Sequence, residues 1–202
     1  MNISKRLFDL FFSILGLIFL MPLFLIIGLL IKIEDGGPVL FVQERVGYRG
    51  RVFKIYKFRT MKVGAQKMGL QITVDGDRRI TKIGRILRKY KIDELPQLFN
   101  VIKGEMSLVG PRPEVPYYVG FYNDKQKKVL EIMPGITDLA SISFINEGEI
   151  LSRSQDPEFE YINNIMEQKI RLNLAYAEKS NILKDFILVL KTVYISFIHK
   201  SK

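Results

Sequence analysis

The sequence contains no cysteine and a single histidine, His199, among its 202 residues. Without cysteine the chain forms neither a disulfide nor a thiolate metal site, which agrees with a reducing compartment. The lack of cysteine also excludes Cys-His catalysis and a zinc site made of histidine and cysteine, and His199 as the one histidine disfavours Ser-His-Asp catalysis. Any catalysis must therefore use carboxylates, Lys, Arg, Tyr, Ser, or a hard cation held by oxygen atoms.

Acidic residues are scarce in the middle of the chain. The whole sequence carries 31 Lys and Arg residues against 21 Asp and Glu residues, a net charge of +10. Residues 45–103 alone contain sixteen basic and four acidic residues, a net charge of +12. Such a field attracts polyanions, which include nucleic acid, anionic lipid head groups and phosphorylated substrates. Charge alone does not choose among them.

Two adjacent acids, Asp93 and Glu94, stand alone between Asp77 and Glu105, among eight Lys and Arg residues. Neighbouring cations favour the ionised form of such carboxylates. The pair precedes a predicted helix over residues 95–101, so helix capping is one explanation. The others are Mg²⁺ binding and attack on a phosphorus atom. Spacing and charge alone favour capping.

The N-terminal region is strongly apolar. Residues 10–31 contain no charge and would form a helix of ~33 Å, enough for a hydrocarbon core of ~30 Å. Pro22 favours a kink near its middle. Lys5 and Arg6 precede the segment and the basic region follows it, so the positive-inside rule puts both ends in the cytoplasm. The sequence supports a spanning helix and a re-entrant helix that breaks at Pro22 about equally. In the re-entrant helix, Asp9 is expected near the lipid head groups.

Further cations occur at positions suited to an anion. Residues 39–42 and 52–59 are predicted to form a hairpin, with Lys57 and Arg59 on one strand face. The alternative is a solvated edge strand. A helix over residues 80–91 has a cationic face that includes Arg88 and would rest on lipid or on a phosphate. Arg112 lies between two prolines in a rigid turn, which suits bidentate phosphate binding, although an ordinary loop Arg is the alternative.

The fold predicted from these patterns is mainly α with a small β-hairpin. Residues 1–33 form the N-terminal re-entrant membrane helix, and residues 34–202 form a catalytic domain on the cytoplasmic face. A helix over residues 182–198 has one apolar face. It either packs on the core or, as an amphipathic helix, lies in the membrane interface.

Two eight-residue motifs resemble those of the bacterial sugar transferases, the small monotopic phosphoglycosyl transferases. They are Asp-Glu-Leu-Pro-Gln-Leu-Phe-Asn at 93–100 and Met-Ser-Leu-Val-Gly-Pro-Arg-Pro at 106–113. Lys-Phe-Arg-Thr-Met at 57–61 and Pro-Gly-Ile-Thr at 134–137 match the same family in the same order. The resemblance extends from residue 5 to about residue 180.

The resemblance implies transfer of a phosphosugar from a UDP-sugar to polyprenol (undecaprenyl) phosphate, with release of UMP. This reaction is the first membrane step of surface polysaccharide or glycoprotein glycan synthesis, on the cytoplasmic face of the bacterial inner membrane. The resemblance assigns Asp93 as the nucleophile that forms a covalent intermediate. Glu94 is grouped with it as a catalytic dyad that supports Mg²⁺ binding. Arg112 is expected to contact the substrate phosphates, and Lys57, Arg59 and Arg88 are expected among the cations around them.

The sequence departs from the family pattern at two places. The membrane break reads Met21-Pro22 in place of Ser-Pro, and the segment after Thr137 lacks the Arg associated with nucleotide contact. No base-binding residue is therefore predicted. The transferase hypothesis includes no nucleic-acid partner. The alternative hypothesis is a basic peripheral module without catalysis that binds the membrane or nucleic acid.

Overall fold

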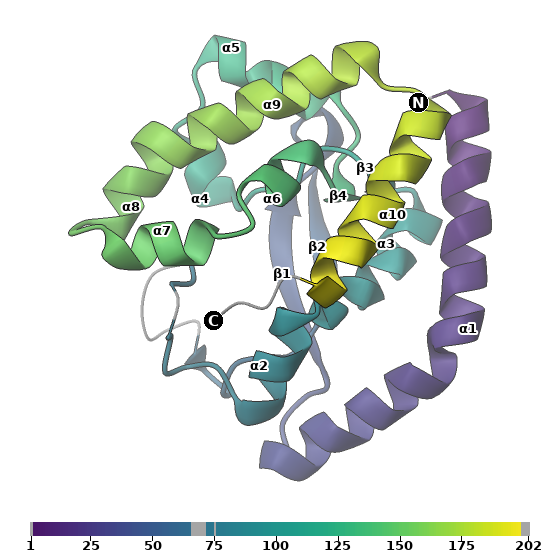
Figure 1. Cartoon of the computed structure of the whole chain (residues 1–202), viewed down its shortest axis with the longest axis vertical. Helices are drawn as coiled ribbons and strands as arrows, with labels where there is room; N and C mark the ends of the chain where they lie inside the picture. Colours follow the sequence, from purple (N-terminus) through teal and green to yellow (C-terminus); the bar gives the residue numbers. More distant parts are fainter. Residues whose placement is uncertain (1, 66–71, 75, 199–202) are drawn as a thin grey trace.

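A computed structural model describes residues 2–65, 72–74 and 76–198. His199 lies outside the described residues. The chain is mainly helical and contains a small antiparallel hairpin, which confirms the predicted fold class at that level. In Figure 1 the long first helix follows one side of the molecule, while the other helices surround the hairpin.

Helix α1, Ile3–Asp35, is the longest element, with 33 residues and a length of ~50 Å. Asn2 caps its start by accepting from the Ser4 N–H, and Gly36 ends it in the left-handed conformation, at φ 69°. Pro22 lies inside the helix, which Figure 1 shows bent along its length. Within the described part of the chain, α1 is the one helix long and apolar enough to cross a membrane, by length and composition.

The first half of α1 is fastened to the rest of the molecule by polar side chains. Lys5 forms an ion pair with Asp185, and the Arg6 guanidinium donates to the Val101 and Ile102 carbonyls at 2.6 and 2.8 Å. Asp9 is fully buried. Its Oδ1 accepts from the Leu108 N–H at 3.1 Å. The Asp9 carboxylate therefore serves a backbone donor inside the protein, and its position near the lipid head groups stays a prediction.

The hairpin consists of β1, Leu40–Val46, and β2, Val52–Phe58, joined by the short 3₁₀ turn η1, Tyr48–Gly50. The strands are antiparallel, with Gln43 opposite Ile55. Strand β2 ends one residue before Arg59. The predicted strand face shared by Lys57 and Arg59 is therefore not formed.

The segment that carries the acid pair is built from three short helices. They are α2, Lys82–Lys89, the 3₁₀ helix η3, Ile92–Gln97, and α3, Leu98–Lys103. The helix predicted over residues 95–101 is thus split, with Asp93 and Glu94 inside the 3₁₀ turn. Lys91, just before η3, is a non-glycine residue in the left-handed region, at φ 56°.

A parallel pair of strands joins two proline turns that are far apart in the sequence. Strand β3, Ser107–Val109, pairs with β4, Gly135–Thr137. The Gly110 N–H donates to Thr137 O, and the Gly135 N–H donates to Pro111 O, both at 3.0 Å. A Cβ at Gly135 would overlap the Gly110 backbone, so only glycine permits this approach. The Pro-Arg-Pro turn is thereby held in place.

The remaining helices cover the hairpin and the β3–β4 pair. They are α4, Pro116–Val119; α5, Asp124–Lys127; η4, Lys128–Glu131; α6, Leu139–Ser143; α7, Glu147–Arg153; α8, Pro157–Glu160; the π-helical turn η5, Tyr161–Ile165; α9, Met166–Lys179; and α10, Ile182–Ile198. One apolar cluster lies between α4, α7 and α9, and a second joins α1, β2, α3 and α10.

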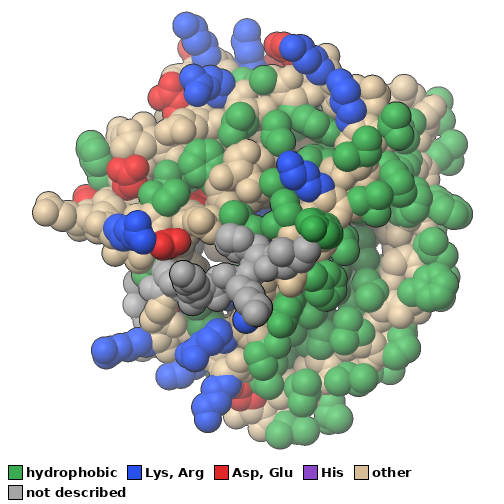
Figure 2. Space-filling model, in the orientation of Figure 1, with side chains coloured by type: hydrophobic (Ala, Val, Ile, Leu, Met, Phe, Trp, Pro, Cys, Tyr) green, Lys and Arg blue, Asp and Glu red, His purple; other side chains and the backbone are tan. Residues whose placement is uncertain are grey.

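Helix α10 turns most of its apolar face outward. Leu183, Tyr194 and Phe197 are each more than 60% exposed, whereas Asp185 and Leu188 are buried. Figure 2 shows hydrophobic side chains spread over the face that contains α10 and α1. Core packing therefore does not account for this apolar face, and contact with the membrane interface stays the prediction for it.

Candidate active site

Asp93 and Glu94 lie in the first turn of η3, which packs against β2. Their exposed fractions are only 7% and 8%. The cap position of η3 belongs to Lys91, and neither carboxylate accepts a bond from a backbone N–H of the described residues. Helix capping, which spacing alone favoured, is thus not what these side chains do.

The Glu94 carboxylate is held by two cations. Arg112 donates from Nη1 to Oε2 at 2.8 Å and from Nη2 to Oε1. Lys57 Nζ donates to Oε1 at 3.1 Å. Burial acts to raise the pKa of Glu94, but the charges of Arg112 and Lys57 outweigh it and hold that pKa well below its usual value. Glu94 is therefore ionised and largely occupied by protein partners.

The neighbouring Asp93 is in a different state. Its carboxylate accepts no hydrogen bond from any residue that the structure describes, although the side chain is buried. Burial raises the pKa of Asp93, and the charge of Glu94 raises it further, against the pull of nearby cations. Nearby cations thus outweigh burial at Glu94 and lower its pKa, whereas at Asp93 burial and the Glu94 charge outweigh the cations and raise its pKa.

Two of the predicted cations do stand at this pair. Lys57, at the end of β2, contacts Glu94 directly, and burial lowers the Lys57 pKa to about 8. Arg88, near the end of α2, donates from Nε to Thr60 Oγ1 at 2.8 Å, and its charge acts on Asp93. Together with Arg112, these side chains place three cations around the two acids.

Arg59, in contrast, is drawn away from the acid pair. Its guanidinium pairs with both oxygens of Asp35 at the end of α1 and donates from Nε to Pro38 O at 2.6 Å. It is only 7% exposed. The structure therefore brings together Lys57, Arg88 and Arg112 from the predicted set, but it does not bring Arg59 to them.

The turn that carries Arg112 is held by a hydrogen bond to Asp138, in the segment after Thr137 that departs from the family pattern. Asp138 Oδ2 accepts from the Arg112 backbone N–H at 2.8 Å, while its Oδ1 accepts from the Ser141 N–H as the N-cap of α6. Asp138 is 2% exposed. Sequence reasoning gave Asp138 no role, although an Asp directly before the first residue of a helix is a capping signal.

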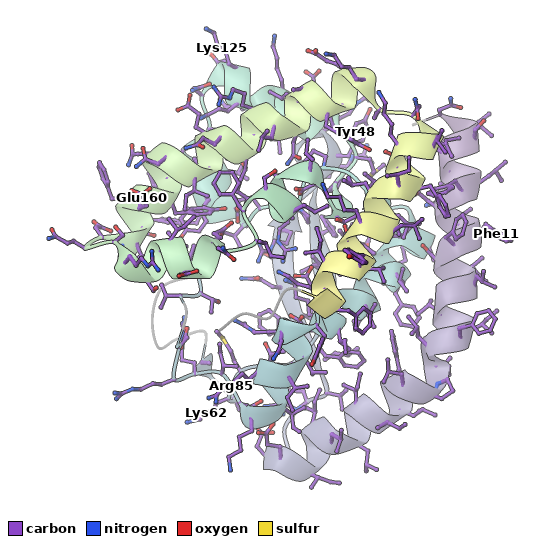
Figure 3. The ribbon with its side chains drawn as sticks, viewed as in Figure 1. Phe11, Tyr48, Lys62, Arg85, Lys125 and Glu160 are labelled. Atoms are coloured by element: carbon purple, nitrogen blue, oxygen red, sulfur yellow. The ribbon has the colours of Figure 1, made fainter. Side chains whose placement is uncertain are left out.

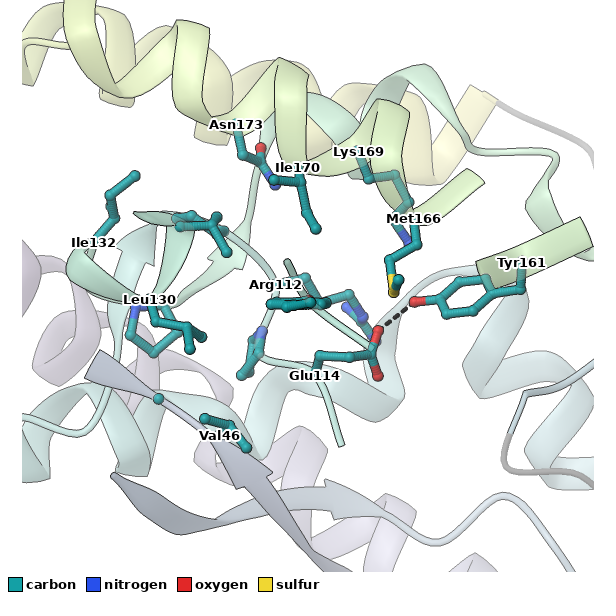
Figure 4. A pocket seen from close by; sticks show the side chains of 16 residues that line it. Val46, Arg112, Glu114, Leu130, Ile132, Tyr161, Met166, Lys169, Ile170 and Asn173 are labelled. Atoms are coloured by element: carbon teal, nitrogen blue, oxygen red, sulfur yellow. Dashed lines mark hydrogen bonds between the residues drawn. The ribbon is translucent and has the colours of Figure 1, made fainter. Parts of the chain in front are cut away.

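A second polar network lies behind the same turn. Arg45 Nη1 donates to Pro113 O and Glu114 Oε1, both at 3.2 Å. The Tyr161 hydroxyl donates to Glu114 Oε2, as the dashed line in Figure 4 marks. Pro113, Glu114 and Tyr161 line a small cavity of about 40 Å³ together with Arg112. The sequence offered no signal for this network, because its members are up to 116 positions apart.

The oxygen ligands that Asp93 and Glu94 offer could fill only part of the coordination shell of a hard cation. In the described residues there is no group of three or more His, Cys, Asp or Glu that could enclose a metal. Mg²⁺ usually takes one or two carboxylates and completes its shell with phosphate oxygens and water. The buried, hydrogen-bond-free carboxylate of Asp93 fits that role, with Glu94 as a second oxygen donor already shared with Arg112.

Comparison with known proteins identifies the class of this chain. The sequence profile of the family described as bacterial sugar transferase matches residues 1–199. The chain therefore belongs to the bacterial sugar transferase family.

Three curated relatives illustrate the range of that family. Galactosyl transferase CpsE of Streptococcus agalactiae is 37% identical over 96% of this chain and 42% of its own length. A putative undecaprenyl-phosphate N-acetylgalactosaminyl 1-phosphate transferase of Bacillus subtilis is 43% identical over 66% of this chain and 70% of its own length. UDP-glucose:undecaprenyl-phosphate glucose-1-phosphate transferase of Klebsiella pneumoniae is 35% identical over 98% of this chain and 41% of its own length. The chain thus spans less than half of two of these relatives.

Proposed function

We propose that this protein is a membrane-bound phosphoglycosyl transferase that moves a phosphosugar from a UDP-sugar to undecaprenyl phosphate. The reaction proceeds in two displacements. The Asp93 carboxylate attacks the phosphorus that bears the sugar, and the P–O bond to UMP breaks. The phosphate oxygen of undecaprenyl phosphate then attacks the same phosphorus and releases Asp93. A carboxylate nucleophile has no proton to lose, so the reaction needs no histidine as base.

One observation carries this proposal: of two adjacent buried acids, only Glu94 accepts hydrogen bonds from cations, while Asp93 has no hydrogen-bond partner among the described residues. A free carboxylate can approach a phosphorus atom, whereas one held in an Arg fork cannot. The cations Lys57, Arg88 and Arg112 offset the repulsion between Asp93 and the diphosphate and stabilise charge on the transferring group.

Asp93 and Glu94 would hold Mg²⁺ together with phosphate oxygens of the donor. When bound, the ion neutralises charge on the diphosphate and on the departing UMP. Arg112 keeps Glu94 ionised and oriented for this task, and its own side chain remains 30% exposed, so it can reach a substrate phosphate as well.

The docking of α1 supports a re-entrant helix with both ends in the cytoplasm. Its N-terminal part is tied to the domain through Arg6 and Asp9, and its C-terminal end through Asp35. A straight spanning helix separates its ends by the ~30 Å hydrocarbon core, so one folded domain could not hold both. Phe11, which Figure 3 shows projecting outward from α1, and the exposed face of α10 would then meet lipid.

The alternative of a basic binding module is disfavoured by where its charges go. Within residues 45–103 the cations Arg45, Lys57, Arg59 and Arg79 are all in ion pairs with acids. Lys62 and Arg85, which Figure 3 shows pointing away from the body, are exposed and suit anionic lipid. These four cations are engaged by acids of the protein, and one of them, Lys57, belongs to the site around Glu94.

The proposal is tested by UMP release from purified protein in lipid nanodiscs with undecaprenyl phosphate. The donors are UDP-galactose, UDP-N-acetylgalactosamine and UDP-glucose, the sugars in the names of the relatives. We expect Mg²⁺-dependent release with at least one donor and none with Asp93→Asn. Membrane binding without turnover of any donor would favour the binding module instead.

A further inference from the structure

The C-terminal end of α1 is joined to the catalytic side of the molecule by two consecutive acids. Arg59 Nη1 lies 2.5 Å from Asp35 Oδ2, and Nη2 donates to the other carboxylate oxygen. The same guanidinium donates to Pro38 O from Nε. Because such a planar fork fixes direction as well as distance, the residues that follow β2 are held against the end of the membrane helix.

The second acid, Glu34, caps a different helix. Its Oε1 accepts from the backbone N–H groups of Lys82 and Ile83 at 2.7 and 3.3 Å. Thr81 Oγ1 accepts from the Gly84 N–H at 2.9 Å. The first turn of a helix has N–H groups without partners in the helix itself. Here α1 supplies part of the cap of α2, so the start of α2 is fixed relative to the membrane helix.

Thr60 joins these two attachments to the catalytic pair. It follows Arg59 directly, its carbonyl accepts from the Thr81 N–H at 3.0 Å, and its hydroxyl accepts from Arg88 Nε at 2.8 Å. A Cβ at Gly84 would overlap the Thr60 carbonyl, so α2 approaches this backbone as closely as a helix can. A shift at Arg59 is therefore passed to Arg88 through a single residue.

A cluster of buried apolar side chains lies next to these polar contacts. Ile27 and Ile31 of α1 form one buried cluster with Phe58 of β2 and Leu87 of α2. Close-packed side chains transmit displacement instead of absorbing it. The end of α1 and the element that carries Arg88 thus form one rigid corner of the molecule.

We propose that Glu34 and Asp35 are positioning residues, through which the seated end of the membrane helix holds Arg88 beside Asp93. The inference rests on the proposed function, because it concerns the geometry of that reaction, yet neither acid touches a substrate. It also gives Arg59 an anchoring role in place of the phosphate contact expected from the sequence. The contribution of Arg88 to catalysis then depends on how α1 is seated.

The test uses the full chain in lipid nanodiscs with the donor that it turns over. We expect kcat to fall about 10-fold in Asp35→Ala and in Glu34→Ala, with the donor KM within about 2-fold, since a displaced charge costs rate more than binding. Glu149→Ala, which removes an exposed ion pair with Arg153, should change neither kcat nor the donor KM.

A double-mutant cycle separates positioning from a general loss of stability. In an Arg88→Gln background, Asp35→Ala should lower the residual kcat by less than about 2-fold, because the group through which it acts is gone. Additive losses in the two backgrounds would overturn the proposal, since they would mean that Asp35 acts by a route other than Arg88.

A second readout does not depend on turnover. Hydrogen exchange of the Lys82 and Ile83 amides should become at least about 10-fold faster in Glu34→Ala, while amides of α9 stay protected. Unchanged exchange at these two amides would overturn the proposal whether or not the wild type releases UMP. Faster exchange in a protein that releases no UMP would uphold the tether and reject the proposed function instead.

Discussion

Arg112 and Glu94 face each other as an ion-paired fork, with Nη1 2.8 Å from Oε2 and Nη2 donating to Oε1. This pairing separates the roles of two acids that are adjacent in the sequence. The charge of Glu94 is balanced by cations of the protein. Asp93 is buried and has no hydrogen-bond partner in the described part of the chain. The predictions below follow from that difference and from the elements that maintain it.

Replacing Glu94 should lower the stability of the protein, whereas replacing Asp93 should not. Glu94→Gln leaves Lys57 and Arg112 facing a neutral group, and we expect a loss of roughly 2 kcal/mol in unfolding free energy, moderated by the 30% exposure of Arg112. Asp93→Asn removes a buried charge that burial disfavours, so its stability should stay within about 0.5 kcal/mol of wild type or exceed it. Thermal unfolding in detergent measures both. A larger loss in Asp93→Asn than in Glu94→Gln would contradict the assignment.

The rate should fall in alkali because of Lys57. Burial lowers its pKa to about 8, so the side chain is charged below that pH and loses its charge as the pH rises through it. We expect kcat/KM, which reports groups of the free enzyme, to decline above pH 8. Lys57→Arg keeps the charge and should move that decline to higher pH. An unmoved alkaline limb in Lys57→Arg would assign it to another group.

The network behind the Pro-Arg-Pro turn should matter for both fold and rate. Glu114 accepts from Arg45 and from the Tyr161 hydroxyl, and Glu114→Gln leaves the buried Arg45 guanidinium without a counter-charge. We expect a loss of about 2 kcal/mol in stability and a lower kcat as Arg112 loses its support. Glu149→Gln, at an exposed ion pair, is the matched control and should change both values little.

The topology of α1 can be tested in a chain that is naturally free of cysteine. Single cysteines at Asn2 and at Gly36, one beyond each end of α1, should both resist a membrane-impermeant thiol reagent in intact cells. Both should react once the inner membrane is permeabilised. Labelling of either position in intact cells would show that α1 crosses the bilayer.

The sequence was sufficient for local structure and for the identity of the acid pair. The period-two pattern predicted the hairpin, and the apolar periodicity predicted α10 with its observed bounds. It did not predict which way α10 faces, because an amphipathic stripe is the same for a protein core and for lipid. The buried side of α10 in fact contains Asp185, which pairs with Lys5.

Long-range partners were beyond sequence reasoning. Lys57 and Arg59 are equivalent by strand alternation, yet one meets Glu94 and the other meets Asp35. The difference arises because β2 ends at Phe58 and because the end of α1 lies beside it. The upward shift of the Asp93 pKa was missed for a similar reason, since burial by β2 is a tertiary effect that local charge does not reveal.

The central claim is that Asp93 carries the phosphosugar. Its most direct test is mass spectrometry of the protein after incubation with Mg²⁺ and a UDP-sugar donor in the absence of undecaprenyl phosphate. We predict a mass increase of one phosphosugar on the peptide that contains Asp93, which disappears when undecaprenyl phosphate is added and never forms in Asp93→Asn. Full UMP release by Asp93→Asn, or a phosphosugar found on another residue, would contradict the account.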